Sequence, residues 1–217
     1  MTGPCDPFDP DARAAVYRAI RSRRDTRHFA GGEVPEDVLA RVMGAAHHAP
    51  SVGLMQPWRF LRIVDPAVRV AIRGVVETER QRTAAALGDR GEEFGRLKVE
   101  GITECAEVIV VALGTGRDAH VFGRRTMPQM DLASVACAIQ NMWLAARAEG
   151  YGMGWVSMFD PAELSALLGI PDAADPIAVL CLGPVDAFYD RPMLVETGWA
   201  VERPLSELCA TDRWPAT

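Results

Sequence analysis

Four arginines surround a single aspartate, Asp25, near the start of the chain: Arg21, Arg23, Arg24 and Arg27. The whole chain has a formal net charge of −6, so this basic cluster differs from its background. Guanidinium groups bind phosphate oxygens in pairs, and the cluster therefore indicates either a phosphate ligand or, as charge runs more often do, a solvated surface. A carboxylate is not needed to hold an anion, so Asp25 requires a separate role.

Two further segments have the composition of ligand-binding loops. Residues 49–58 are rich in proline and glycine and follow an expected helix end, so their backbone could line a flat ring. Residues 150–157 place three glycines ahead of an expected strand, and glycine permits close approach of the backbone to a ligand. Trp155 and Ser157 lie two positions apart and therefore face the same side of that strand. The alternatives are a structural turn and an ordinary hydrogen-bonded serine.

The elements that must position these residues are helices and separated strands. Apolar residues at helical spacing predict helices over 11–21, 35–46, 66–76, 130–149 and 161–168. Compact or alternating apolar runs predict strands over 59–64, 108–113, 154–159 and 177–182. Because the order is not a regular βαβ alternation, we expect an α+β fold with a mixed central sheet flanked by helices.

The length of 217 residues fits a single domain over 1–217. Within it, the charged residues 78–104 predict a lid-like surface excursion, and residues 184–217 predict an arm that wraps another surface. The helix over 130–149 is apolar nearly all round, which predicts burial in a core or in a dimer interface.

Composition argues against several classes of function. A pI near 5.3 argues against nucleic acid as the main partner. The five cysteines are widely spaced, so neither a zinc ribbon nor a CxxC pair is expected, and we expect no metal; Cys137 and Cys181 are expected in the core. No signal peptide or apolar run of about eighteen residues occurs, so we expect a cytoplasmic protein without a membrane span. Residues 114–119 fit G-x-G-x-x-A, but no helical pattern follows, which favours a plain turn.

Four segments, in this order, resemble the FMN-dependent nitroreductase family: the arginine cluster ending at Phe29, residues 49–58, residues 152–155, and Arg203 before Pro204. Within that family the sequence is similar to the group of 5,6-dimethylbenzimidazole synthases, which have aspartate at the position of Asp25, where ordinary nitroreductases have serine or another small residue. Further segments match motifs of that group: residues 47–58, 97–102, 127–132, 143–150 and 154–157.

The resemblance implies a homodimer with two sites at its interface. Reduced FMN (FMNH2) would be a substrate rather than a retained cofactor, and O2 would convert it to 5,6-dimethylbenzimidazole, the lower ligand of cobalamin, and erythrose 4-phosphate. A separate flavin reductase would supply FMNH2 at the expense of NAD(P)H. The residues expected to contact the flavin are Arg23, Arg24, Asp25, Thr26, Arg27, Pro50, Ser51, Gly53, Leu97, Gly154, Trp155 and Arg203, with the four arginines on the phosphate.

Asp25 and Ser157 are the expected catalytic residues. Asp25 would accept a proton from a ribityl hydroxyl or from C1′ as the chain breaks, or would orient the chain. Neighbouring arginines lower its pKa and burial raises it, and the sequence leaves open which effect is larger. Ser157 would hydrogen-bond the ring near N5 and C4a. The alternatives are an NAD(P)H-dependent nitroreductase or flavin reductase of the same fold, and a flavin-binding module without catalysis.

Overall fold

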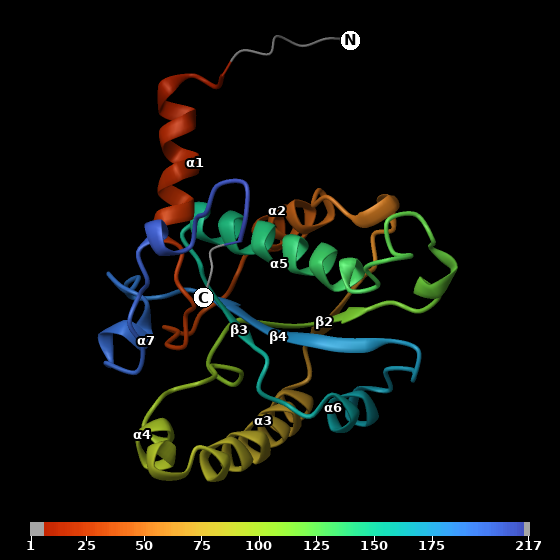
Figure 1. Ribbon diagram of the computed structural model, residues 1–217. Helices are drawn as coiled ribbons and strands as arrows, with labels where there is room; N and C mark the ends of the chain where they lie inside the picture. The colour runs from red at the N-terminus through yellow and green to blue at the C-terminus, as the bar shows by residue number, and fades with distance from the viewer. Residues whose placement is uncertain (1–6, 215–217) are drawn as a thin grey trace.

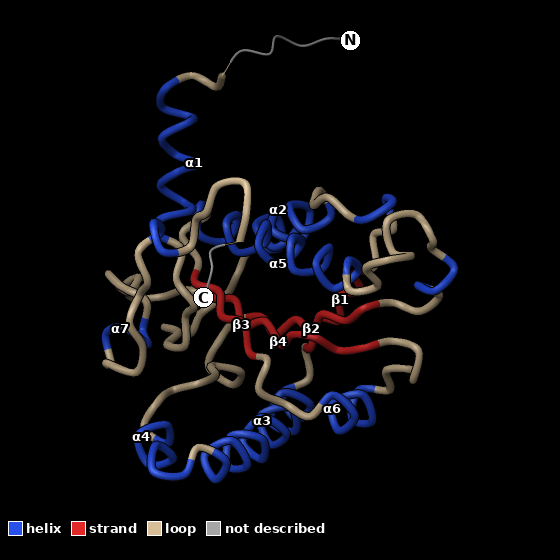
Figure 2. Tube along the Cα trace, in the orientation of Figure 1, coloured by secondary structure: helices blue, strands red, loops and turns tan. Residues whose placement is uncertain are grey.

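The computed structural model describes residues 7–214, which form an α+β fold with a sheet between two groups of helices (Figures 1 and 2). The sheet has four strands in the order β1-β2-β4-β3. These strands are β1 (Trp58–Ile63), β2 (Glu107–Leu113), β3 (Gly152–Val156) and β4 (Asp175–Gly183). One face is covered by α2 (Glu36–His47) and α5 (Met130–Ala148), and the other by α3 (Pro66–Ala86) and α6 (Pro161–Leu168).

Strand β2 lies inside the sheet and is buried at every position. Successive side chains of a strand point to opposite faces. Ile109 and Val111 therefore pack with the layer of α2 and α5, whereas Val108 and Val110 pack with Ile72 of α3. A strand covered on both faces needs apolar residues at successive positions, and this requirement explains the unbroken apolar run that marks β2 in the sequence.

The sheet differs from the expected mixed sheet, because its four strands pair only in the antiparallel sense. Helix α3 joins β1 to β2 and helix α6 joins β3 to β4, and in both cases the second strand runs opposite to the first. Helix α5 joins β2 to β3, which run in the same direction on either side of β4. Within the described residues, parallel pairing outside these strands is an isolated bridge between Asp25 and Met153 of β3. This bridge joins the arginine cluster to an edge of the sheet.

Most predicted elements are confirmed within a few residues, including the first helix, α1 (Pro10–Ser22). Helix α3 is longer than predicted and continues to Ala86, into the expected excursion. Its last turns are rich in strong helix formers, and Arg80 pairs with Glu77 one turn earlier. The rest of the excursion contains the short helix α4 (Gly91–Gly95), and the C-terminal arm contains α7 (Met193–Glu196). Strand β3 begins two residues before its predicted start and ends at Val156.

Two helices leave apolar side chains uncovered. Helix α1 projects from the body (Figure 1) and buries none of its residues; Val16, Tyr17 and Ile20 are 46–54% exposed. On α5, Cys137 is exposed, so its predicted place in the core is wrong, whereas Cys181 of β4 is fully buried as predicted. Helix α5 is apolar nearly all round, and one chain covers only part of its circumference.

Three further features bear on other classes of function. Residues 114–119 form a turn containing a short 3-10 segment (Arg117–Ala119), as expected, and α5 begins only at Met130. No three His, Cys, Asp or Glu side chains between residues 7 and 214 gather as a metal site requires. None of the helices described over the same residues is long and apolar enough to cross a membrane.

The core of the sheet gives a stability prediction. Leu180 of β4 is fully buried, and Leu180→Ala should lower the free energy of unfolding by about 2–5 kcal/mol, because it removes buried methyl groups and leaves a cavity. Urea unfolding followed by circular dichroism measures the change. The matched control is Leu167→Ala on α6. Leu167 is 39% exposed, so this substitution should lower the free energy of unfolding clearly less. Equal costs for the two variants would contradict the described packing.

Candidate functional site

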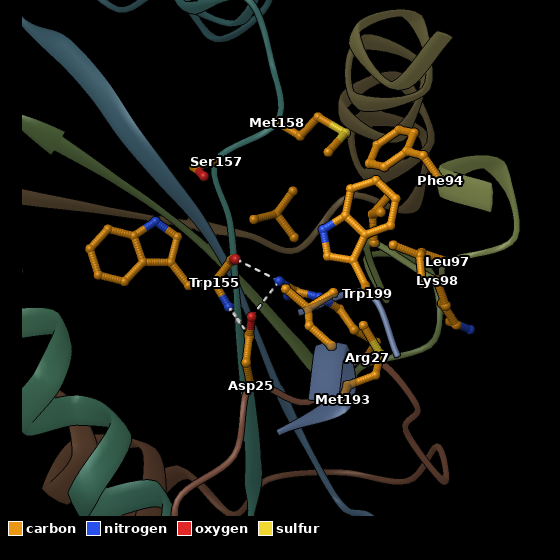
Figure 3. Close-up of a pocket in the computed structure, with 13 residues that line it drawn as sticks. Asp25, Arg27, Phe94, Leu97, Lys98, Trp155, Ser157, Met158, Met193 and Trp199 are labelled. Atoms are coloured by element: carbon orange, nitrogen blue, oxygen red, sulfur yellow. Dashed lines mark hydrogen bonds and ion pairs between the residues drawn. The ribbon is translucent and has the colours of Figure 1, made fainter. Parts of the chain in front are cut away.

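The Asp25 carboxylate is fixed against strand β3 by both of its oxygens (Figure 3). Oδ1 accepts a hydrogen bond of 2.9 Å from the Trp155 backbone N–H. Oδ2 pairs with Nη2 of Arg27 at 2.6 Å. The same Nη2 donates to the Trp155 carbonyl oxygen at 2.8 Å. Asp25 and Arg27 are therefore held to one residue of β3 and to each other.

The glycines of β3 allow this close approach. A Cβ on Gly154 would lie 2.2 Å from the Thr26 carbonyl oxygen and 2.8 Å from Nη1 of Arg27. Thr26 is buried and its N–H donates to the Met153 carbonyl at 3.0 Å. The sequence suggested that these glycines admit a ligand. The structure instead shows that Gly154 makes room for Thr26 and Arg27.

Asp25 and Arg27 line a cavity of about 200 Å³, which we call the apolar cavity. Trp155 of β3 and the exposed Ser157, which directly follows the last residue of that strand, line the same cavity. Leu97, which we predict to contact the flavin, also lines it. Its remaining walls come mainly from the α4 segment and the C-terminal arm: Phe94, Lys98, Val99, Val156, Met158, Met193, Leu194 and Trp199 (Figure 3).

A second cavity of about 400 Å³, which we call the basic cavity, adjoins the first. The two share Asp25, Met193 and Leu194. The basic cavity is lined by Arg21, Arg23 and Arg24, together with Ile20, Pro192 and Glu202. Together the two cavities fall within the range of about 300–1,000 Å³ typical of small-molecule sites. They can hold a ligand with a flat apolar part and an anionic tail, with Asp25 where the two parts meet.

The four arginines predicted to bind the phosphate lie in different parts of the structure. Arg23 lies over the Trp143 ring, with Cζ 4.6 Å from its centroid. Arg24 donates to three backbone carbonyls, at 2.6–2.8 Å, those of Arg21, Arg23 and Asp190. Arg27 lies in the apolar cavity with Asp25. Arg203 is 66% exposed, pairs with Glu207 at 3.4 Å and lines neither cavity.

Pro50, Ser51 and Gly53 are not brought to these cavities within one chain. Their loop leads into β1, and β1 and β3 form opposite edges of the sheet. Three strand spacings separate those edges, a distance of about 14 Å. No residue of the loop over 49–57 is among the described residues that line either cavity. The predicted contact residues therefore form two groups on opposite sides of the chain.

The loop after α2 has an unusual backbone. Leu54 and Gln56 have positive φ angles of 54° and 49°, next to Gly53 at 53°. Such angles are uncommon for residues other than glycine and are often found at functional sites. Two serine hydroxyls support the loop: Ser134 of α5 accepts from the Val52 N–H and Ser51 accepts from the Gln56 N–H, each at 3.0 Å. The loop is thus held in one shape although it lies at the surface.

Partial burial has the largest effect on the pKa of Asp25. It raises the pKa of the carboxyl above the ordinary value, whereas Arg27, the Trp155 N–H and Arg23 act in the opposite direction. The side chain remains 44% accessible through the cavity. The sequence left the balance between burial and the arginines open, and in the folded chain burial is the larger effect.

Sequence reasoning missed the contribution of the C-terminal arm. Met193, Leu194 and Trp199 line the apolar cavity, although the arm was expected to wrap a different surface. Little periodicity marks this part of the chain. The available signal was a tryptophan, Trp199, within a proline-rich segment.

Comparisons with known proteins agree with this geometry. The model of the nitroreductase family matches residues 20–184. A 5,6-dimethylbenzimidazole synthase of Rhodospirillum rubrum is 39% identical, over 94% of this chain and 96% of its own length. A protein of the same name from Rhodobacter capsulatus is 36% identical, over 91% and 96%.

Solved structures show the same fold. A BluB-like flavoprotein from Clostridium difficile superimposes with a TM-score of 0.69 at 20% identity, covering 91% of this chain and 99% of that one. An iodotyrosine deiodinase bound to FMN and 3-iodo-L-tyrosine gives a TM-score of 0.66 at 23% identity, covering 87% and 97%. With residues 20–184 matched and synthases similar over nearly its whole length, the chain belongs to the nitroreductase family, in the group of its 5,6-dimethylbenzimidazole synthases.

Proposed function

We propose that this protein fragments reduced FMN with O2, giving 5,6-dimethylbenzimidazole and erythrose 4-phosphate. One observation carries the proposal: Asp25 lies in the wall shared by an apolar and a basic cavity. A flavin ring in the first cavity and its phosphate in the second would place the ribityl chain, which must be cut, beside this carboxylate. The relatives named 5,6-dimethylbenzimidazole synthase support the same reaction.

The residues present fit a reduced flavin. Phe94 and Leu97 provide apolar walls for the ring, and Arg23 and Arg24 line the cavity proposed for the phosphate. Nε of Arg24 and Nη1 of Arg27 are buried and have no hydrogen-bond partner among residues 7–214. Buried donors usually have partners, so these two are available for oxygen atoms of a ligand. The reduced ring supplies the electrons that O2 accepts.

Asp25 has the position and the chemistry of a general base. Its raised pKa strengthens it as a proton acceptor, while Arg27 and the Trp155 N–H stabilise the ionised form. We infer that it accepts a proton from a ribityl hydroxyl or from C1′. Ser157, exposed at the end of β3, would donate a hydrogen bond to the ring edge. The apolar walls would exclude water from the reacting atoms.

The proposed active unit is a homodimer. Pro50, Ser51 and Gly53 lie on the opposite edge of the chain from Asp25, so a site that uses both groups needs two copies. Apolar residues without a partner in one chain support this: three on α1, and on the arm Val201, Leu205, Leu208 and Trp214, which are 60–89% exposed. Because each turnover consumes one FMNH2, the proposal includes a separate flavin reductase that uses NAD(P)H. It also includes a cytoplasmic location.

Asp25→Asn tests the role of the carboxylate. The variant keeps the size of the side chain and removes the base, so product formation should fall about 100-fold or more, while FMN binding persists. Chemically reduced FMN is mixed with air-saturated buffer and the products are identified by mass. Asp172→Asn, at an exposed position remote from both cavities, is the control. A normal yield of product from the Asp25 variant would contradict this role. If the wild-type protein oxidised NADH and left FMN intact, the protein would be a reductase instead.

The raised pKa of Asp25 also predicts a pH profile. A base works only when deprotonated, so the rate should fall with decreasing pH at a midpoint above about 3.9, the ordinary aspartate value. Single-turnover rates of the wild type, measured at about pH 4–8, give this midpoint. A rate independent of pH down to the ordinary aspartate pKa would argue against proton transfer to Asp25.

Val16→Asp tests the dimer. Val16 is 47% exposed on α1, and a charge there should lower the self-association of the chain if this face meets a second copy. Sedimentation equilibrium should give twice 23.6 kDa for the wild type and a smaller average mass for the variant. Val70→Asp on α3, 61% exposed, is the matched control and should leave the mass unchanged. A wild-type monomer that still makes product would overturn the two-copy site.

A further inference from the structure

The C-terminal arm and the α4 segment meet on a single indole. The Cζ atom of Arg90, just before α4, lies 3.6 Å from the centroid of the Trp199 ring. Nη2 of Arg90 also donates to the Trp199 carbonyl oxygen at 3.3 Å. Phe94 of α4 lies on the same tryptophan, with ring centroids 6.0 Å apart. Trp199 and Phe94 both line the apolar cavity (Figure 3).

We propose that Trp199, held by Arg90, closes the apolar cavity over the flavin ring and so determines whether O2 is used for fragmentation or released as hydrogen peroxide. This inference rests on the proposed function. It assigns to the arm a specificity-determining residue for that reaction, separate from Asp25 and Ser157.

The two sides of the apolar cavity, which has a volume of about 200 Å³, are held in different ways. The side formed by β3 is fixed by backbone pairing to β4. The side formed by Met193, Leu194 and Trp199 belongs to the arm and lies outside the sheet. Movement of this side leaves the sheet intact.

The arm is anchored before it reaches Trp199. Arg24 donates to the Asp190 carbonyl at 2.6 Å, and Arg147 lies over the Phe188 ring at 3.9 Å. Beyond these contacts, the Arg90 guanidinium and the Phe94 ring hold Trp199 through stacking, which breaks and forms again without loss of backbone structure. We therefore assign the opening and closing movement of this proposal to the segment over 193–199, with the contacts at Phe188 and Asp190 as its fixed base.

Closure matters because reduced flavin has a competing reaction. FMNH2 and O2 give FMN and H2O2 when two electrons and two protons pass from the ring to oxygen. An open cavity admits water and lets the peroxide leave, whereas a closed cavity retains the oxygen at the ring. Loss of the indole should therefore shift the products toward peroxide more than it weakens binding, since the phosphate cavity is unchanged.

The test measures how one equivalent of FMNH2 is divided between products. Trp199→Ala and Arg90→Ala should each lower the molar ratio of 5,6-dimethylbenzimidazole to hydrogen peroxide, by about five-fold for Trp199→Ala, with a smaller change in affinity for oxidised FMN. Trp199→Phe keeps an aromatic ring and should recover much of the ratio. The control is Val70→Ala on α3, because Val70 is 61% exposed and lies outside both cavities and the proposed dimer face.

A second readout needs no flavin. In the free protein, amide hydrogen exchange over residues 91–98 should be faster in Trp199→Ala and in Arg90→Ala than in the wild type or in Val70→Ala. Unchanged product ratios in both variants, with normal product from the wild type, would overturn the role of Trp199 and leave the proposed function standing. Unchanged exchange would overturn the contact itself. Wild-type protein that makes no 5,6-dimethylbenzimidazole would overturn both proposals.

Discussion

The site depends on one close contact, the docking of the segment that contains Asp25 onto strand β3. Asp25 and Met153 form a parallel bridge, and Gly154 leaves space that any Cβ would fill, 2.2 Å from the Thr26 carbonyl. The Trp155 N–H then binds the Asp25 carboxylate. Without this contact the arginine cluster would be a charged loop after α1. With it, the cluster becomes part of the wall of two cavities.

The same contact explains the electrostatics of the site. Docking removes the Asp25 carboxyl from bulk water, which raises its pKa, and brings Arg27 against it, which limits that rise. A carboxylate on the exposed loop of an acidic protein would not have this balance. Arg27 serves Asp25 here, so the phosphate of the proposed substrate is left to Arg23 and Arg24 in the neighbouring cavity.

Two proposals, the site shared between two copies and its closure by the arm, follow from parts of the site that a single chain leaves incomplete. The loop with Ser51 and Gly53 is supported by side-chain hydrogen bonds and lies at the opposite edge of the sheet from Asp25, which supports the proposal of a site shared between two copies. The arm, by contrast, returns to its own chain and places Trp199 over the apolar cavity. In these proposals, the side built on the sheet positions the substrate and the side formed by the arm keeps water out.

The sequence by itself determined most of the elements, because apolar periodicity is a local property: the helices, the buried run of β2 and the resemblance carried by Asp25 were all readable. It did not determine the antiparallel sheet, the exposure of Cys137 or the place of Trp199. Strand direction depends on how connections cross the sheet, and exposure depends on which helix face finds a neighbour. The sequence also did not determine the raised pKa of Asp25, because its carboxyl is buried only after distant segments of the chain meet.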